Sequence, residues 1–158
     1  MAHKRARPGT PLLQRLMDNA IVTEGGCWIW DGHTNSEGYG TINVDYMPKL
    51  VHKLAYELLV GPVPKGKHLD HLCHGWDGDC PGGPLCLHRP CFNPEHLHPK
   101  TPRGNTLALG SKSIAAINAR KMHCPKNHRY TKSNTRVTKK GQRICKTYQR
   151  DNDKGRKR

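Results

Sequence analysis

Residues 68–73 read HLDHLC, and residues 91–105 read CFNPEHLHPKTPRGN. The first stretch places Asp70 next to His71. The second ends on Asn105, about one turn into a helix that Thr101 is expected to cap, with a proline at its first position. Carboxylate and amide oxygens are hard ligands for Mg²⁺, which keeps several waters, and a histidine beside such an ion can activate water. The pattern predicts a site for metal-assisted hydrolysis of a phosphodiester.

These residues resemble the HNH endonuclease family of the His-Me finger group, in particular its short phage-type members with the pattern DHLC…CxNPxHL…TxxxN. The upstream CWIWDG, GYGTI and VHKLAYELLVGPVPKG resemble the segment that precedes the motif in those members, so the resemblance covers about residues 25–110. It implies that His71 is the general base and that Asp70 and Asn105 hold one divalent ion, Mg²⁺ or Mn²⁺. His96 joins the catalytic set at the middle position of the family's His-Asn-His triplet, where it orients the loop that carries the base.

The resemblance implies an α+β fold, a small ββα-metal (His-Me finger) nuclease domain made of a two-stranded ribbon and a helix. Strand-like residues 67–72 and 96–100 agree with that ribbon. A short strand-strand-helix segment precedes the domain, and a basic Cys/His tail follows it. The expected parts are a basic arm and short helix (1–24), the strand-strand-helix segment (25–62), the nuclease motif with a Cys-rich insertion (63–110), a helical linker (111–122) and the tail (123–158).

Local patterns make these parts more specific. Leucines at helical spacing predict a short helix over residues 11–20, after a disordered arm over 1–10. CWIW and YGTINV are expected to pair as strands across a long loop. The i, i+4 pattern of LVHKLAYELLV predicts a helix over residues 50–60, ended by Gly61 and Pro62. His52 faces one side of this helix, where it is expected to pack or to contact phosphate rather than to act in catalysis. The final DKGRKR is expected to fray.

Four cysteines interrupt the nuclease motif. An N-terminus without the apolar stretch of a secretory signal indicates a reducing compartment, the cytoplasm of a host cell if a phage encodes the chain. There, clustered cysteines indicate metal. Four thiolates satisfy a tetrahedral structural Zn²⁺, and the alternatives are four free cysteines or a zinc ligand role for His71. The expected zinc ligands are Cys73, Cys80, Cys86 and Cys91.

The tail offers a second set of soft ligands, Cys124, His128 and Cys145. Family members often end in a Cys-x3-His…Cys-x-x-Cys knuckle, and Tyr148 stands where the fourth ligand would be. Two alternatives stay open: His123 replaces the missing thiolate, or the tail has lost its metal and serves as a basic arm.

Charge separates the tail from the rest of the chain. The 158 residues carry 27 Lys and Arg against 12 Asp and Glu, and residues 111–158 hold 16 of the cations with two acids. Only 34% of residues are apolar, which excludes a large core, and no apolar run is long enough for a membrane span. Such a tail suits DNA phosphates, although it can also merely solubilise. The expected phosphate contacts are Lys126, Arg129, Lys132, Arg136, Lys139, Lys140 and Arg143.

The sequence therefore predicts a metal-dependent HNH endonuclease that hydrolyses DNA without a small-molecule cofactor. Its activity is expected to fail at acid pH as His71 protonates, near the usual value of about 6.5. The alternative is a zinc-stapled DNA-binding module that no longer cuts, in which Asp70, His71 and Asn105 are idle. An RNA-binding zinc protein has less support, because no aromatic-rich sheet signature is visible.

Overall fold

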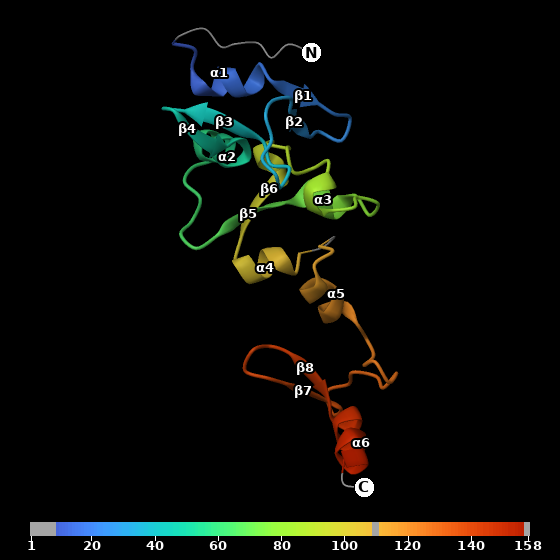
Figure 1. Cartoon of the computed structure of the whole chain (residues 1–158). Helices are drawn as coiled ribbons and strands as arrows, with labels where there is room; N and C mark the ends of the chain where they lie inside the picture. The colour runs from blue at the N-terminus through green and yellow to red at the C-terminus, as the bar shows by residue number, and fades with distance from the viewer. Residues whose placement is uncertain (1–8, 109–110, 157–158) are drawn as a thin grey trace. The chain divides into compact units, whose positions relative to one another are not determined.

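The computed structural model divides the chain into two compact units, Met1–Ala116 and Ile117–Arg158, which we call unit 1 and unit 2. It describes residues 9–108 and 111–156 (Figure 1). Nearly all of the expected N-terminal arm lies outside the described residues. None of the helices in the two described ranges is long and apolar enough to cross a lipid bilayer.

Unit 1 begins with the predicted short helix and two antiparallel hairpins. The elements are α1 (Leu12–Met17), β1 (Ala20–Val22) paired with β2 (Trp28–Trp30), and β3 (Thr41–Val44) paired with β4 (Met47–Leu50). The expected pairing of CWIW with YGTINV is wrong, because each strand pairs with its nearest neighbour in sequence. Asp45 and Tyr46 both have positive φ, as a two-residue type I′ turn requires, and this turn closes the second hairpin.

The predicted helix over residues 50–60 is confirmed as α2 (Val51–Leu59), which Figure 1 shows against the β3–β4 hairpin. Its buried face includes His52, for which packing was one of the two expected roles. The core that α2 helps to close is small. It consists of Leu16, Trp30, Val51, Ala55 and Phe92.

Phe92 brings the nuclease motif into this core. Its ring meets Trp28 and Trp30 edge to face, with centroids 5.8 and 6.2 Å away. The backbone of this segment also pairs with β2: Phe92 N donates to the Trp28 carbonyl at 2.9 Å, and Trp30 N donates to the Pro90 carbonyl at 3.0 Å. Residues 90–92 are thereby fixed alongside β2.

The two strands expected from the motif form a ribbon, β5 (His68–His71) with β6 (Leu97–Lys100), in which Asp70 faces His98 and His71 faces Leu97. Figure 1 shows β5 running directly into α3 (Leu72–Trp76). Two short 3₁₀ turns follow, Gly83–Leu85 and Pro94–His96. After β6, helix α4 (Pro102–Thr106) contacts both strands. Thr101 caps it as predicted, since its Oγ1 accepts from Gly104 N at 3.0 Å.

The rest of the chain contains α5 (Ile114–Arg120), β7 (Thr135–Val137) paired with β8 (Arg143–Cys145), and α6 (Lys146–Arg156). Helix α5 falls within the expected linker and spans the boundary between the units. The C-terminal end was expected to fray, but α6 is helical as far as Arg156.

Candidate functional site

His71, at the end of β5, is the residue expected to act as a base, and it is buried. Its Nε2 lies 3.0 Å from the carbonyl oxygen of Cys91. Because a carbonyl can only accept, Nε2 carries the proton and donates it. The lone pair of the neutral ring is then on Nδ1, which is the atom able to take a proton.

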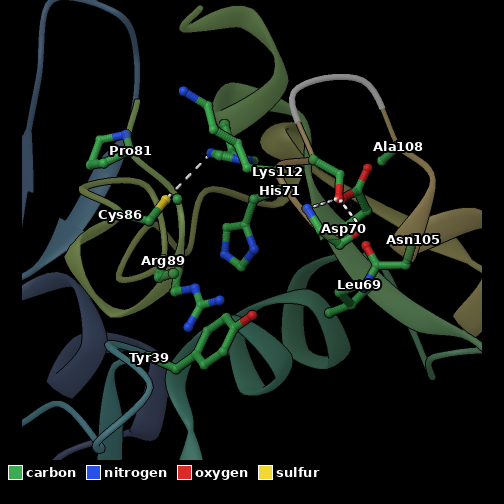
Figure 2. Close-up of a pocket in the computed structure, with 15 residues that line it drawn as sticks. Tyr39, Leu69, Asp70, His71, Pro81, Cys86, Arg89, Asn105, Ala108 and Lys112 are labelled. Carbon is green, nitrogen blue, oxygen red and sulfur yellow. Dashed lines mark hydrogen bonds between the residues drawn. The ribbon is translucent and has the colours of Figure 1, made fainter. Parts of the chain in front are cut away.

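A cavity of about 480 Å³ is lined by all three residues that the motif singles out, Asp70, His71 and Asn105. Figure 2 shows the His71 ring in the middle of this view, with Asp70 and Asn105 on one side and Arg89 and Tyr39 on the other. Strand β5 supplies the first two residues, and α4 supplies Asn105 just after β6. The ribbon and the capped helix therefore converge on one cavity.

Asp70 and Asn105 suit a hard cation, since they offer a carboxylate and an amide oxygen in a cavity with room for water and a phosphate. The Asp70 carboxylate also has an internal partner: Lys100 Nζ lies 2.5 Å from Oδ2. A divalent cation would have to share Asp70 with Lys100 or displace it.

Two further cations line the cavity, Arg89 and Lys112. The Arg89 guanidinium lies 4.9 Å from the centroid of the Tyr39 ring and donates to the Glu37 carbonyl. Sequence reasoning missed both cations because they follow no spacing relative to the motif. They add positive charge to the wall of the cavity.

Burial lowers the pKa of two neighbouring histidines, His52 and His71. It lowers the pKa of His52 to about 3, and the His52 ring lies 5.1 Å from that of His71. Burial also lowers the pKa of His71, although its bond to the Cys91 carbonyl acts in the opposite direction. The pKa of His71 therefore lies below the usual value of about 6.5.

A buried group behind the ribbon consists of Cys27, Cys73, Cys91 and His96, and we call it the core cluster. Its ligand atoms all lie within 4.8 Å of one another. His96 Nδ1 is 3.4 Å from Cys27 Sγ and 3.8 Å from Cys91 Sγ. With Zn–S of about 2.3 Å and Zn–N of about 2.0 Å, a tetrahedral ion separates a sulfur from a nitrogen by about 3.6 Å. The donor set and its spacing fit Zn²⁺.

Electrostatics in the core cluster agree with a cation site. A hydrogen bond from Cys73 lowers the pKa of Cys91 to about 5, whereas burial raises the pKa of Cys27 to about 11. Thiols bind a metal in their deprotonated form, and the low pKa of Cys91 favours that form at one sulfur of the cluster.

The predicted zinc site of four cysteines is wrong. Cys73 and Cys91 belong to the core cluster, but Cys80 and Cys86 join two histidines in a separate group. The backbone pairing of residues 90–92 with β2 draws Cys91 toward Cys27, which has no spacing signal because it lies 46 residues before Cys73.

His96 also occupies a different place from the one expected for a catalytic residue. It is buried with its Nδ1 in the core cluster, and it does not line the cavity. Its influence on His71 runs through Cys91, whose sulfur belongs to the cluster and whose carbonyl accepts from His71. The alternative zinc ligand role for His71 is not supported, because His71 is outside the cluster.

The second group is formed by His74, Cys80, Cys86 and His88, and we call it the loop cluster. The tail cluster in unit 2 brings together the three predicted residues, Cys124, His128 and Cys145. His128 Nδ1 lies 3.6 and 3.8 Å from the two sulfurs. Neither His123 nor the Tyr148 side chain joins them as a fourth donor among the described residues. Tyr148 instead donates its backbone N–H to Cys145 Sγ at 3.4 Å.

The predicted phosphate contacts are mostly free to meet a ligand, since six of the seven side chains are exposed. Arg143 is the exception. It is half-buried, stacks 4.5 Å from the centroid of the Tyr130 ring and donates to the Asn118 carbonyl. Its contacts stabilise unit 2 itself.

Comparison with known proteins finds relatives in a phage. The chain is 32% identical over 101 residues to Protein 2.8 of Escherichia phage T7, which covers 64% of this chain and 61% of that protein. It is 35% identical over 90 residues to Protein 7.7 of the same phage, covering 57% and 59%. The chain thus spans about three fifths of each relative. It matches no protein-family model and no solved structure.

Proposed function

We propose that this protein is a metal-dependent DNA endonuclease of the HNH type, in which β5, β6 and α4 form a ββα-metal nuclease domain. The observation that carries the proposal is the orientation of His71 by the Cys91 carbonyl in the cavity that Asp70 and Asn105 also line. The similarity to two phage proteins suits a chain that works in the cytoplasm of an infected host.

The residues divide the reaction among themselves. His71 Nδ1 takes a proton from a water whose oxygen attacks the phosphorus, and the bond from phosphorus to the 3′ oxygen breaks. Asp70 and Asn105 would hold one Mg²⁺ or Mn²⁺. When bound, such an ion stabilises negative charge on the phosphate and on the leaving oxygen. The Cys91 carbonyl keeps His71 in the tautomer that can accept the proton.

The cations have two roles in this proposal. Arg89 and Lys112 bind phosphates next to the one that is cut, because they line the same cavity. The exposed cations of unit 2 bind duplex phosphates without reading sequence. A structural Zn²⁺ in the core cluster would hold Cys91, and with it the acceptor that orients the base.

Cleavage of supercoiled plasmid by the purified chain with Mg²⁺ or Mn²⁺ tests the proposal, with EDTA as the metal-free control. His71→Ala should lower the cleavage rate by about 10²–10⁴-fold, the usual contribution of a general base. DNA binding, measured by gel shift, should be unchanged. His68→Ala is the matched control, since His68 lies exposed on the same strand, and it should cut normally.

Two results would contradict the proposal. Equal cleavage by the wild type and His71→Ala would remove His71 from the reaction. A wild type that shifts the plasmid and never nicks it with either ion would favour the zinc-stapled DNA-binding module, in which the Asp70 carboxylate serves its ion pair with Lys100.

A further inference from the structure

The loop cluster gathers four ligand atoms from one short stretch of chain, residues 74–88. The four atoms lie within 4.8 Å of one another. His74 Nδ1 is 3.3 Å from Cys80 Sγ and 3.5 Å from Cys86 Sγ, and the two sulfurs are 3.4 Å apart. His88 Nδ1 lies 3.9 Å from Cys86 Sγ. These spacings resemble those of ligands around one tetrahedral Zn²⁺, for which sulfur and nitrogen are about 3.6 Å apart.

A carboxylate supports one of these imidazoles from outside the cluster. His88 turns its Nδ1 toward Cys86, and its Nε2 lies 3.8 Å from Asp77 Oδ2. Histidines that bind a metal commonly point their other ring nitrogen at a carboxylate, which fixes the ring and makes the ligand more basic. The contact between His88 and Asp77 is independent of the distances between the sulfurs and the imidazoles. It also indicates that His88 is a metal ligand.

Hydrophobic burial does not account for the fold of this loop. Leu85 and Leu87 are 76% and 75% exposed, and Trp76 is 62% exposed. The buried side chains between residues 77 and 90 are Cys80 and Cys86. A loop that buries little besides two thiols needs another source of stability, and a bound metal is the usual one.

We infer that the loop cluster binds its own Zn²⁺, distinct from the ion assigned to the core cluster. The site is complete, since two thiolates and two imidazoles satisfy a tetrahedral ion. The loop that it closes forms one wall of the cavity, to which Pro81, Gly82, Cys86 and Arg89 contribute. Arg89 directly follows His88, so the ion also sets the position of this cation. The metal site stands without the proposed nuclease activity, and only the role of the wall in holding DNA depends on it.

Zinc content of the full-length protein tests this inference. Wild type, Cys80→Ser/Cys86→Ser and Leu85→Ser/Leu87→Ser are purified without chelator, and zinc per chain is measured by mass spectrometry of the metal. The cysteine variant should hold one zinc ion fewer than the wild type. The leucine variant changes two exposed side chains of the same loop and should hold as many as the wild type. An equal zinc content in all three proteins would overturn the inference.

A second measurement on the wild type guards against a cysteine variant that fails to fold. Amide hydrogen exchange of residues 77–89 should accelerate when a chelator removes zinc, and added Zn²⁺ should restore protection. Exchange that is indifferent to zinc would overturn the inference, as would native protein with a disulfide between Cys80 and Cys86. Neither measurement uses cleavage, so the zinc result and the nuclease result can fail separately.

Discussion

Units 1 and 2 both contain a cysteine and histidine cluster, but they differ in what surrounds it. Unit 1 packs Phe92 and four other buried side chains into a core, and it holds two clusters of four donors. In the described part of unit 2 the buried residues are Cys124 and Cys145, and its cluster has three donors. Unit 1 therefore has an apolar core besides its clusters, whereas we expect unit 2 to depend on a metal held by its cluster.

The units also differ in charge. Residues 117–158 contain 15 of the 27 basic side chains and two of the 12 acids. A small unit with this much positive charge repels itself, and a bound polyanion would relieve that repulsion. The comparison teaches that cavity and charge are divided: the cavity lined by Asp70, His71 and Asn105 belongs to unit 1, and most of the positive charge belongs to unit 2.

The largest expected effect is the unfolding of unit 2 when one of its ligands is removed. Cys145→Ser should collapse the amide NMR signals of residues 117–156 to the narrow range of an unfolded chain, because no apolar core replaces the ligand. The signals of unit 1 should not move. Lys146→Gln, an exposed neighbour, is the control. Dispersed signals from unit 2 in Cys145→Ser would show that it folds without its cluster.

Removal of the central aromatic residue of unit 1 should have the next largest effect. Phe92→Ala should lower the free energy of unfolding of unit 1 by about 3–5 kcal/mol, through lost transfer energy and a cavity. Urea unfolding followed by tryptophan fluorescence measures it, since all three tryptophans lie in unit 1. Leu85→Ala, at a 76% exposed position, should cost little. Equal losses in the two variants would argue against the core as a source of stability.

The smallest expected effect is on the salt dependence of DNA binding. If unit 2 supplies the phosphate contacts, Lys139→Gln/Lys140→Gln should reduce the slope of log K against log salt by about 1.8, which corresponds to two lost contacts. Fluorescence anisotropy with a labelled duplex at several salt concentrations gives the slope. Lys65→Gln/Lys67→Gln removes two exposed cations from unit 1 and should leave the slope unchanged. The same reduction in both variants would remove the distinction between the units.

Several elements could be predicted because their signals are local. The pair Thr101 and Pro102 begins α4, and the i, i+4 apolar pattern defines α2. The ribbon was implied by the family resemblance, with which two short strand-like stretches agree, and it places Asp70 and His71 at its end. The helix start and the apolar pattern depend on residues within a few positions of one another, so spacing in the sequence is sufficient for them, whereas the pairing of the two distant strands of the ribbon was expected from the resemblance.

Partners that are distant in sequence were decided by the tertiary structure alone. Spacing grouped Cys73 with Cys80, Cys86 and Cys91, but the backbone of residues 90–92 lies on β2 and carries Cys91 to Cys27. His96 moved from the catalytic set to the core cluster for the same reason. A tetrahedral metal site needs four ligand atoms arranged around one point, and only packing determines which thiols and imidazoles converge there.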